Sequence, residues 1–68
     1  MKEIKVISAS WCTNCNTLKK QLDSMNVKYS VVDADVDIDY VRKVGARSLP
    51  TTVIEEDGEI KEIFIGLS

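Results

Sequence analysis

The most constraining feature of this sequence is a change of hydrophobic period around residue 12. Before it, Ile4, Val6 and Ile7 form a short apolar run within EIKVISA, typical of a strand buried on both faces. After it, apolar residues recur at helical spacing on one stripe that comprises Cys15, Leu18, Leu22 and Met25. The other faces of this predicted helix carry Lys19, Lys20, Gln21 and Asp23. The pattern therefore predicts a strand followed directly by an amphipathic helix.

A second β-rich run and a second, shorter helix are predicted next along the chain. KYSVVDA has the residue types of a strand, and DIDYVRKVG reads as a helix. Asp37 is the predicted N-cap of that helix, Ile38 and Val41 are expected to face inward, and Gly45 suits the position just past its end. A strand, a helix and a strand in succession favour a parallel pair with a right-handed crossover.

The last part of the chain predicts a β-hairpin. In TTVIEEDGEIKEIFIG, two β segments flank Asp57-Gly58, a dipeptide that favours a two-residue turn. The predicted order is β-α-β-α-β-β, which gives one mixed four-stranded α/β sheet with two helices in a single domain, residues 1–68. The helices either share one face of the sheet or lie on opposite faces. Only Leu67 and Ser68 follow Gly66, so we expect no third helix and a thinly covered part of one sheet face.

Composition and charge exclude several classes of function. The chain is 44% hydrophobic and 29% charged, as in an ordinary soluble globular domain, and its net charge of −2 provides no basic face for nucleic acid or anionic lipid. Its first residues include an acidic one, and their apolar run is too short for a signal peptide or a membrane span. We therefore expect a cytoplasmic protein, where thiols are kept reduced.

The two cysteines, Cys12 and Cys15, allow three interpretations. A structural zinc site needs four ligands, and the chain has two cysteines and no histidine, so metal binding requires carboxylates or a site that bridges a dimer. An iron–sulfur cluster likewise needs about four thiolates. A structural disulfide across so short a loop constrains the unfolded chain little. The third interpretation is a reaction centre, and it has positive support.

That support is the unequal placement of the two sulfurs. Cys12 lies at the strand-to-helix junction, where unpaired N–H groups and the helix dipole favour a thiolate and lower a thiol pKa from about 8.5 to roughly 7 or less. Cys15 lies one turn later on the apolar stripe, so we expect Cys12 to be exposed and Cys15 to be shielded. This asymmetry suits two-step thiol–disulfide exchange. Because Thr13 and Asn14 carry no charge, we expect a reductant with a potential nearer about −270 mV than the roughly −120 mV of strong oxidants.

Beyond this spacing, the segments WCTNC and VGARSLPTTVI, with the later DGEI and IGLS, resemble the thioredoxin superfamily. Gly45, Arg47, Pro50 and Thr51 match its G-x-R-x-x-P-T pattern, while CNTLKKQLDSMNVKYSVVD is similar to the short glutaredoxin-like redoxins that serve ribonucleotide reductase. The resemblance implies a thioredoxin-like (glutaredoxin-type) fold that lacks the C-terminal helix. It also implies a redox-active disulfide, with Cys12 as nucleophile and Cys15 as resolving thiol.

The resemblance further implies a substrate groove formed by Trp11, Thr13, Asn14, Leu49 and Pro50. In the family, the proline that matches Pro50 follows a cis peptide bond and faces the cysteines, and the backbone of the preceding residue, here Leu49, binds an extended substrate segment. The alternative is an ordinary proline at the start of a strand. Trp11 is either a core residue or an exposed platform beside the nucleophile, and Arg47 is expected to be a surface residue.

The sequence also departs from the family's pattern. Thioredoxin has a buried aspartate six residues before the nucleophile and a lysine beside it, at places that Val6 and Val31 occupy here. The usual base for the resolving thiol is then absent. Asn14 and the terminal GLS also lack the tyrosine and the Gly-Gly-x-Asp motif of glutaredoxins that use glutathione. These departures favour thioredoxin reductase as the electron donor, with a glutathione-coupled glutaredoxin as the alternative.

Four aspartates alternate in DADVDID, which resembles the opening of a calcium loop. The glycine at position six is missing, and position twelve counted from Asp33 is Val44 instead of glutamate, so we interpret the segment as a solvated strand end that leads into a helix cap. The sequence as a whole predicts a cytoplasmic protein-disulfide reductase and electron carrier in cell redox homeostasis. We expect a monomer without a cofactor that reduces disulfide-containing proteins, ribonucleotide reductase among the candidates, and binds neither nucleic acid nor membrane.

Overall fold

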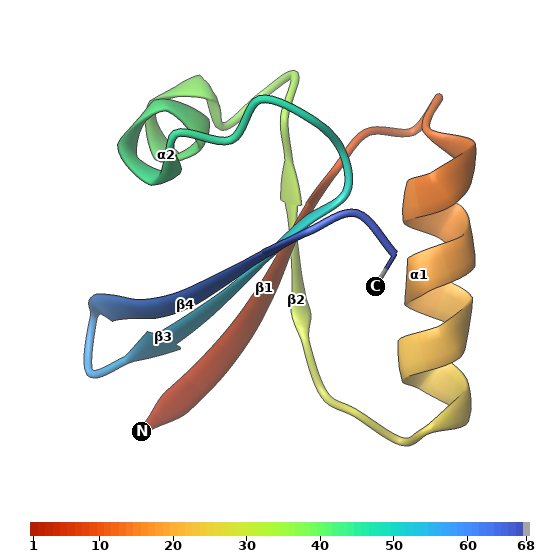
Figure 1. Ribbon diagram of the computed structural model, residues 1–68, viewed down its shortest axis with the longest axis horizontal. Coiled ribbons are helices and arrows are strands. Elements are labelled where there is room, and N and C mark those ends of the chain that lie inside the picture. Colours follow the sequence, from red (N-terminus) through yellow and green to blue (C-terminus); the bar gives the residue numbers. More distant parts are fainter. Residues whose placement is uncertain (68) are drawn as a thin grey trace.

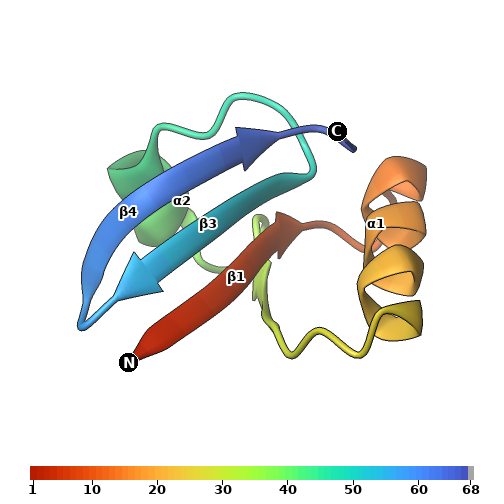
Figure 2. The ribbon, with the colours of Figure 1, turned by 60° about the horizontal axis from the view of Figure 1, so that its bottom comes forward.

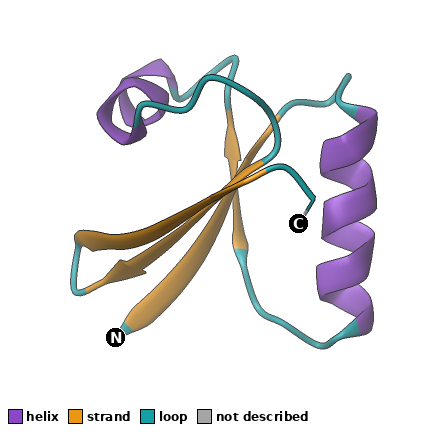
Figure 3. Ribbon diagram, in the orientation of Figure 1, coloured by secondary structure: helices purple, strands orange, loops and turns teal. Residues whose placement is uncertain are grey.

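The predicted order of elements is confirmed in the computed structural model, which describes residues 1–67. The elements are β1 (Lys2–Ser8), α1 (Thr13–Ser24), β2 (Ser30–Asp33), α2 (Ile38–Val44), β3 (Thr51–Glu56) and β4 (Glu59–Ile65) (Figure 1). The loops that join them gather at the two ends of the strands (Figure 3). No helix in residues 1–67 is long and apolar enough to cross a membrane.

The four strands form one mixed sheet in the order β2-β1-β3-β4 (Figure 2). β1 pairs in parallel with β2, with Val6 opposite Val31 and Ile7 opposite Val32. It also pairs antiparallel with β3, and β3 pairs antiparallel with β4. The parallel crossover and the closing hairpin are both as predicted, and β1 lies inside the sheet, consistent with its apolar residues Ile4, Val6 and Ile7.

The two helices lie on opposite faces of the sheet, which resolves the alternative that the sequence left open (Figure 1). On the α2 face, the buried side chains of Ile7, Val32 and Val53 form a cluster against which Tyr40, Val41 and Val44 pack. Successive side chains of a strand point to opposite faces, so Val6, fully buried, points toward α1. β1 therefore contributes to both layers of the core.

The β3–β4 hairpin turns at Asp57 and Gly58, as predicted. Both have positive φ, 52° and 84°, which a type I′ turn requires. The turn also contacts the start of the chain, because the Met1 amino group lies 2.6 Å from Asp57 Oδ1 and the Asp57 amide donates to the Met1 carbonyl at 3.1 Å.

Three local expectations were wrong, and a fourth, the N-cap of α2, is met in position only. Met25 is exposed because α1 ends at Ser24 and the chain turns away there. Ile38 is half-exposed because the inward stripe of α2 starts at Tyr40. Asp37 does occupy the predicted N-cap position of α2, although its side chain makes no capping hydrogen bond. Lys19, assigned to the outer faces of α1, is only partly exposed, and its ammonium lies 3.4 Å from Ser8 Oγ.

A buried polar group, which sequence reasoning missed, lies beneath α2. Glu55 is buried in β3, accepts a hydrogen bond from the Tyr40 hydroxyl, and lies 3.4 Å from Lys5 Nζ. Lys5 Nζ also lies 5.0 Å from the centre of the Tyr40 ring, within cation–π range. The Tyr40 hydrogen bond lowers the pKa of Glu55, burial opposes this, and Lys5 lowers it further. These contacts join α2 to the sheet.

The β4 side of the sheet is thinly covered, as expected. Ile63, Phe64 and Ile65 are all exposed at this edge strand, whereas every second residue of the neighbouring β3 is buried. The core therefore centres on β1 and β3.

Candidate functional site

Cys12 stands at the point where β1 has ended and α1 begins. It is the N-cap residue of α1, with extended backbone angles, and its Sγ accepts a hydrogen bond from the Cys15 amide at 3.1 Å. The Cys12 amide donates to the Ala9 carbonyl at 3.1 Å, and the Cys12 carbonyl accepts the first bond of the helix, from Asn16. A sulfur thus takes the role that a serine or aspartate oxygen commonly plays at this position. Because helix N-termini stabilise negative charge, this place favours a thiolate.

A disulfide joins Cys12 to Cys15, with the two Cα atoms 5.2 Å apart. Cys12 is 7% exposed and Cys15 is 0% exposed. The expectation of an openly exposed Cys12 is therefore wrong for the disulfide form, since its sulfur is bonded to a buried partner and Leu49 packs against the pair. The predicted order of accessibility still holds, because only Cys12 retains any contact with solvent.

The loop before β3 brings Leu49 against this pair, whereas Pro50 is not among the residues that line the cavity at Cys12. The Leu49–Pro50 peptide bond is cis, as the resemblance implied, and Pro50 is buried. Its carbonyl accepts a hydrogen bond from the Gly66 amide at 2.9 Å, and the Thr51 hydroxyl donates to the Ser48 carbonyl at 2.7 Å. Leu49 packs against Ala9 and both cysteines. These bonds fix the loop next to the disulfide.

Trp11 is a surface residue, 69% exposed, so the core alternative is wrong. Its indole Nε1 donates to Asp35 Oδ2 at 3.1 Å. Asp35 belongs to the loop after β2, which is shaped by a hydrogen bond of 2.9 Å from its own amide to Asp33 Oδ1. Trp11 and Asp35 are 24 residues apart in the sequence, so no local signal could have paired them.

A cavity of about 350 Å³ lies beside Cys12. Most of its lining residues are apolar and Arg47 is the cation among them; the lining residues are Trp11, Cys12, Ala34, Val41, Ala46, Arg47, Ser48 and Leu49. Of the predicted groove, Trp11 and Leu49 line this cavity. Thr13 and Asn14 are exposed on the first turn of α1 and lie outside its lining. Arg47 is a surface residue, as expected, and it also borders the cavity.

The aspartate-rich segment runs from the end of β2 into the start of α2. No cluster of three or more metal-ligating side chains occurs within residues 1–67. Asp33 Oδ1 accepts a hydrogen bond from the Asp35 amide, and Asp35 Oδ2 accepts one from the Trp11 indole. Asp37 occupies the N-cap position of α2 without a side-chain hydrogen bond. The interpretation as a strand end leading into a helix is confirmed.

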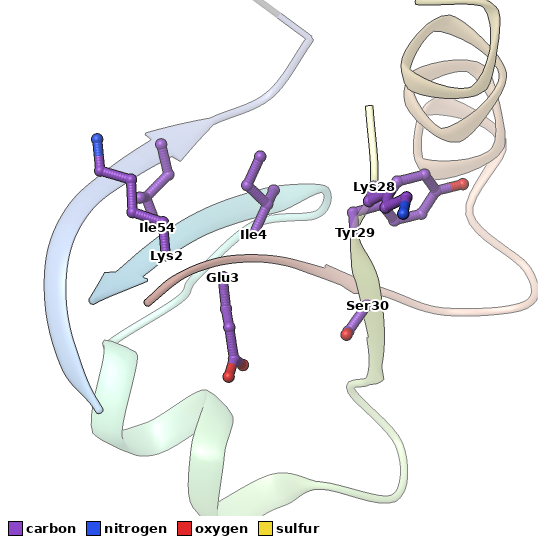
Figure 4. A pocket seen from close by; sticks show the side chains of 7 residues that line it. All are labelled: Lys2, Glu3, Ile4, Lys28, Tyr29, Ser30 and Ile54. Atoms are coloured by element: carbon purple, nitrogen blue, oxygen red, sulfur yellow. The ribbon is translucent and has the colours of Figure 1, made fainter. Parts of the chain in front are cut away.

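A second cavity, of about 470 Å³, lies at the opposite end of the sheet from the cysteines. It is lined by Lys2, Glu3, Ile4, Lys28, Tyr29, Ser30 and Ile54 (Figure 4). Lys2, Ile4 and Ile54 project from one side of the sheet there, and Glu3 from the other. Neither cysteine lines it, whereas Cys12 lines the smaller cavity.

The family to which these features belong is shown by sequence comparison. The glutaredoxin family model matches residues 4–60, and a glutaredoxin from Ricinus communis is 31% identical over 65 residues. That alignment covers 93% of this chain and 58% of the relative, so the chain spans less than two thirds of the relative's length.

Solved structures show the same fold. The structure of Malassezia sympodialis thioredoxin superposes with a TM-score of 0.86 at 22% identity, over 98% of this chain and 64% of that one. Trypanosoma brucei brucei thioredoxin gives 0.85 at 28% identity, over 98% and 64%. The Drosophila germline thioredoxin Deadhead gives 0.88 at 19% identity, over 98% and 70%. This chain belongs to the glutaredoxin family and has the thioredoxin-like fold of that superfamily.

Proposed function

We propose that the protein is a thiol–disulfide oxidoreductase that reduces disulfides in protein substrates. The observation that carries this proposal is Cys12 Sγ at the N-cap of α1, hydrogen-bonded to the Cys15 amide and disulfide-bonded to a buried Cys15. In the reduced protein the same position offers a thiolate a hydrogen bond and the positive end of the helix dipole.

The reaction proceeds by two exchanges. The Cys12 thiolate attacks one sulfur of a substrate disulfide, forming a mixed disulfide and releasing the other substrate sulfur as a thiolate. Cys15 then attacks the Cys12 sulfur, which forms the Cys12–Cys15 bond and releases the second substrate thiol. Two electrons pass from the cysteine pair to the substrate, so an external reductant must restore the dithiol.

The cavity beside Cys12 supports a polypeptide substrate. Its mostly apolar lining suits a side chain next to the substrate cysteine, and the backbone of Leu49, which is part of that lining, is available to an extended substrate segment. Ribonucleotide reductase is one candidate substrate, proposed from the sequence resemblance alone. We place the reaction in the cytoplasm and expect a monomer.

Insulin reduction with dithiothreitol as donor tests the activity. The wild type should accelerate the reaction, and Cys12→Ser should remove the acceleration. Metal analysis of the purified protein belongs beside this assay. Stoichiometric metal together with no turnover would contradict the proposed activity. It would instead support a non-catalytic binding module whose cysteines hold a metal between two copies of the chain.

We propose thioredoxin reductase as the electron donor, because Asn14 and the chain after β4 lack the residues that glutathione-using glutaredoxins carry. Membership of the glutaredoxin family favours the second candidate, glutathione. NADPH oxidation coupled through thioredoxin reductase, compared with oxidation coupled through glutathione and glutathione reductase, separates the two donors. Faster turnover with the glutathione system would assign the protein as a glutathione-coupled glutaredoxin.

A further inference from the structure

The resolving thiol has an apolar setting in this chain. Cys15 is fully buried and clusters with Ala9, Cys12 and Leu49. On the sheet beneath α1, the paired positions Val6 and Val31 carry no ionisable group. Burial disfavours the charged form of a thiol, yet Cys15 must lose its proton to attack Cys12. A source of positive charge near Cys15 would therefore speed the second exchange.

Lys19 is placed to supply that charge. It lies four residues after Cys15, which puts both on the same face of α1. Long side chains of a helix point back toward its N-terminus, so the side chain of Lys19 runs toward the turn that contains Cys15. Its Nζ lies 3.4 Å from Ser8 Oγ, and Ser8 is buried on β1, on the side of the sheet that α1 covers.

The other groups that face this part of α1 do not replace Lys19. Tyr29, before β2, has its hydroxyl 3.4 Å from the Lys19 carbonyl oxygen and donates to Asp23 Oδ1 at 3.0 Å. Asp23 lies a further turn from Cys15, and a carboxylate would oppose a thiolate. The neighbouring Lys20 is exposed. Among the described residues that face Cys15 from α1 and β1, Lys19 is the cation with a fixed partner.

We propose that Lys19, anchored on Ser8, is a positioning residue for the second exchange: its ammonium favours the thiolate form of Cys15. Cys15 first loses its proton to solvent; its thiolate then forms the S–S bond with Cys12, the bond from Cys12 to the substrate breaks, and the substrate sulfur leaves as a thiolate that takes a proton from solvent. Lys19 itself exchanges no proton in this step. The inference rests on the proposed two-cysteine function and adds a residue that serves the second cysteine.

The test isolates Cys15 in the Cys12→Ser background and measures its alkylation rate against pH. Lys19→Met keeps the aliphatic stem and removes the charge, and Lys20→Met, on the adjacent exposed residue, is the matched control. We expect Lys19→Met to move the midpoint upward by on the order of one pH unit, and Lys20→Met to leave it in place. Lys19→Arg should restore most of the shift. Equal midpoints in the two Met variants, or equal shifts in the Met and Arg variants, would overturn the proposal.

A kinetic readout in the protein with both cysteines gives the second arm. A preformed mixed disulfide on Cys12 should resolve about three- to fourfold more slowly at pH 7 in Lys19→Met, because a tenfold lower thiolate fraction is partly offset by higher nucleophilicity. Ser8→Ala should slow this step in the same direction, and the first exchange should be unchanged. Slowing of both exchanges would contradict the assignment to Cys15. Failure of the proposed function itself would appear separately, as an inactive wild type.

Discussion

The two faces of the sheet contrast in how they use polar groups. On the α1 face, two cysteines lie at the start of the helix, and Cys12 is its N-cap residue, with Sγ accepting a hydrogen bond from the Cys15 amide. On the α2 face, the buried carboxylate of Glu55 accepts a hydrogen bond from Tyr40 and pairs with Lys5, beside the apolar cluster of Ile7, Val32 and Val53. The contrast places the cysteine pair in the α1 layer and the contacts of Glu55 in the α2 layer, although Val41 of α2 also lines the cavity beside Cys12. Changes to one face should therefore leave the property of the other intact.

The largest effect is expected on the α1 face. Cys12→Ser should reduce insulin-reducing activity to the level of dithiothreitol alone, because a serine hydroxyl does not form the mixed disulfide. The urea midpoint of the reduced variant should stay close to that of the reduced wild type, since the side chain keeps its size and its cap position. A large loss of stability alongside the loss of activity would contradict the expectation that a change on the α1 face affects activity without affecting stability.

On the α2 face, Ile7→Ala should act on stability first. Ile7 is fully buried between Val32 and Val53, so its truncation should cost about 2–5 kcal/mol in the free energy of unfolding, a large share for so small a domain. Urea denaturation measures this. Ile63→Ala is the control, because Ile63 is an exposed isoleucine on β4, and it should cost less than about 1 kcal/mol. Equal costs at the two positions would contradict the placement of the core.

Tyr40→Phe tests the buried acid. The pKa of Glu55 is lowered in the folded state, chiefly by the Tyr40 hydrogen bond. The ionised group therefore stabilises the fold at pH values above its pKa in the unfolded chain, which is about 4.3. This stability is lost as pH falls through the lower folded pKa. The variant should be less stable by about 1 kcal/mol at pH 7, and the difference should shrink in acid.

Urea titrations at several pH values measure this difference. Tyr29→Phe is the control, since its hydroxyl donates to the exposed Asp23. It should have a smaller effect. The alkylation rate of Cys12 should be the same in wild type and Tyr40→Phe. A changed rate would show that the two faces are coupled.

The smallest effect is expected at the hairpin turn, away from both layers. Gly58 has a φ of +84°, where a Cβ is disfavoured, although nothing lies within 4 Å of the place that an added Cβ would take. Gly58→Ala should therefore cost about 1 kcal/mol of stability, through backbone strain alone. Chemical denaturation checks the value, and activity should be unchanged. An unaltered urea midpoint would mean that the turn relaxes to another type.

The sequence predicted the element order, the mixed sheet and the place of Cys12 at the strand-to-helix junction because these follow from local signals. The apolar run at β1, the helical spacing after Cys12 and the Asp57-Gly58 turn each specify their own segment. The resemblance implied the cis Leu49–Pro50 bond, which periodicity does not encode.

Side-chain contacts between segments far apart in the sequence could not be predicted from the sequence. The Trp11–Asp35 and Lys19–Ser8 pairs join residues whose separation carries no pattern. Glu55 was the exception. It alternates with Thr51 and Val53 on the inward side of β3, so the period of two in a strand could have predicted its burial. The ends of helices were also misjudged: Met25 continued a helical spacing past the last turn of α1.

The central claim is that the sulfur at the helix N-cap is an anion near neutrality while its partner stays sheltered. Iodoacetamide labelling of the fully reduced protein across pH, with each cysteine quantified by mass spectrometry, tests it most directly. The account predicts that Cys12 reacts with a midpoint at about pH 7 or below and that Cys15 reacts far more slowly throughout. Equal rates at both cysteines, each with a midpoint near about 8.5 as in a free peptide, would contradict it.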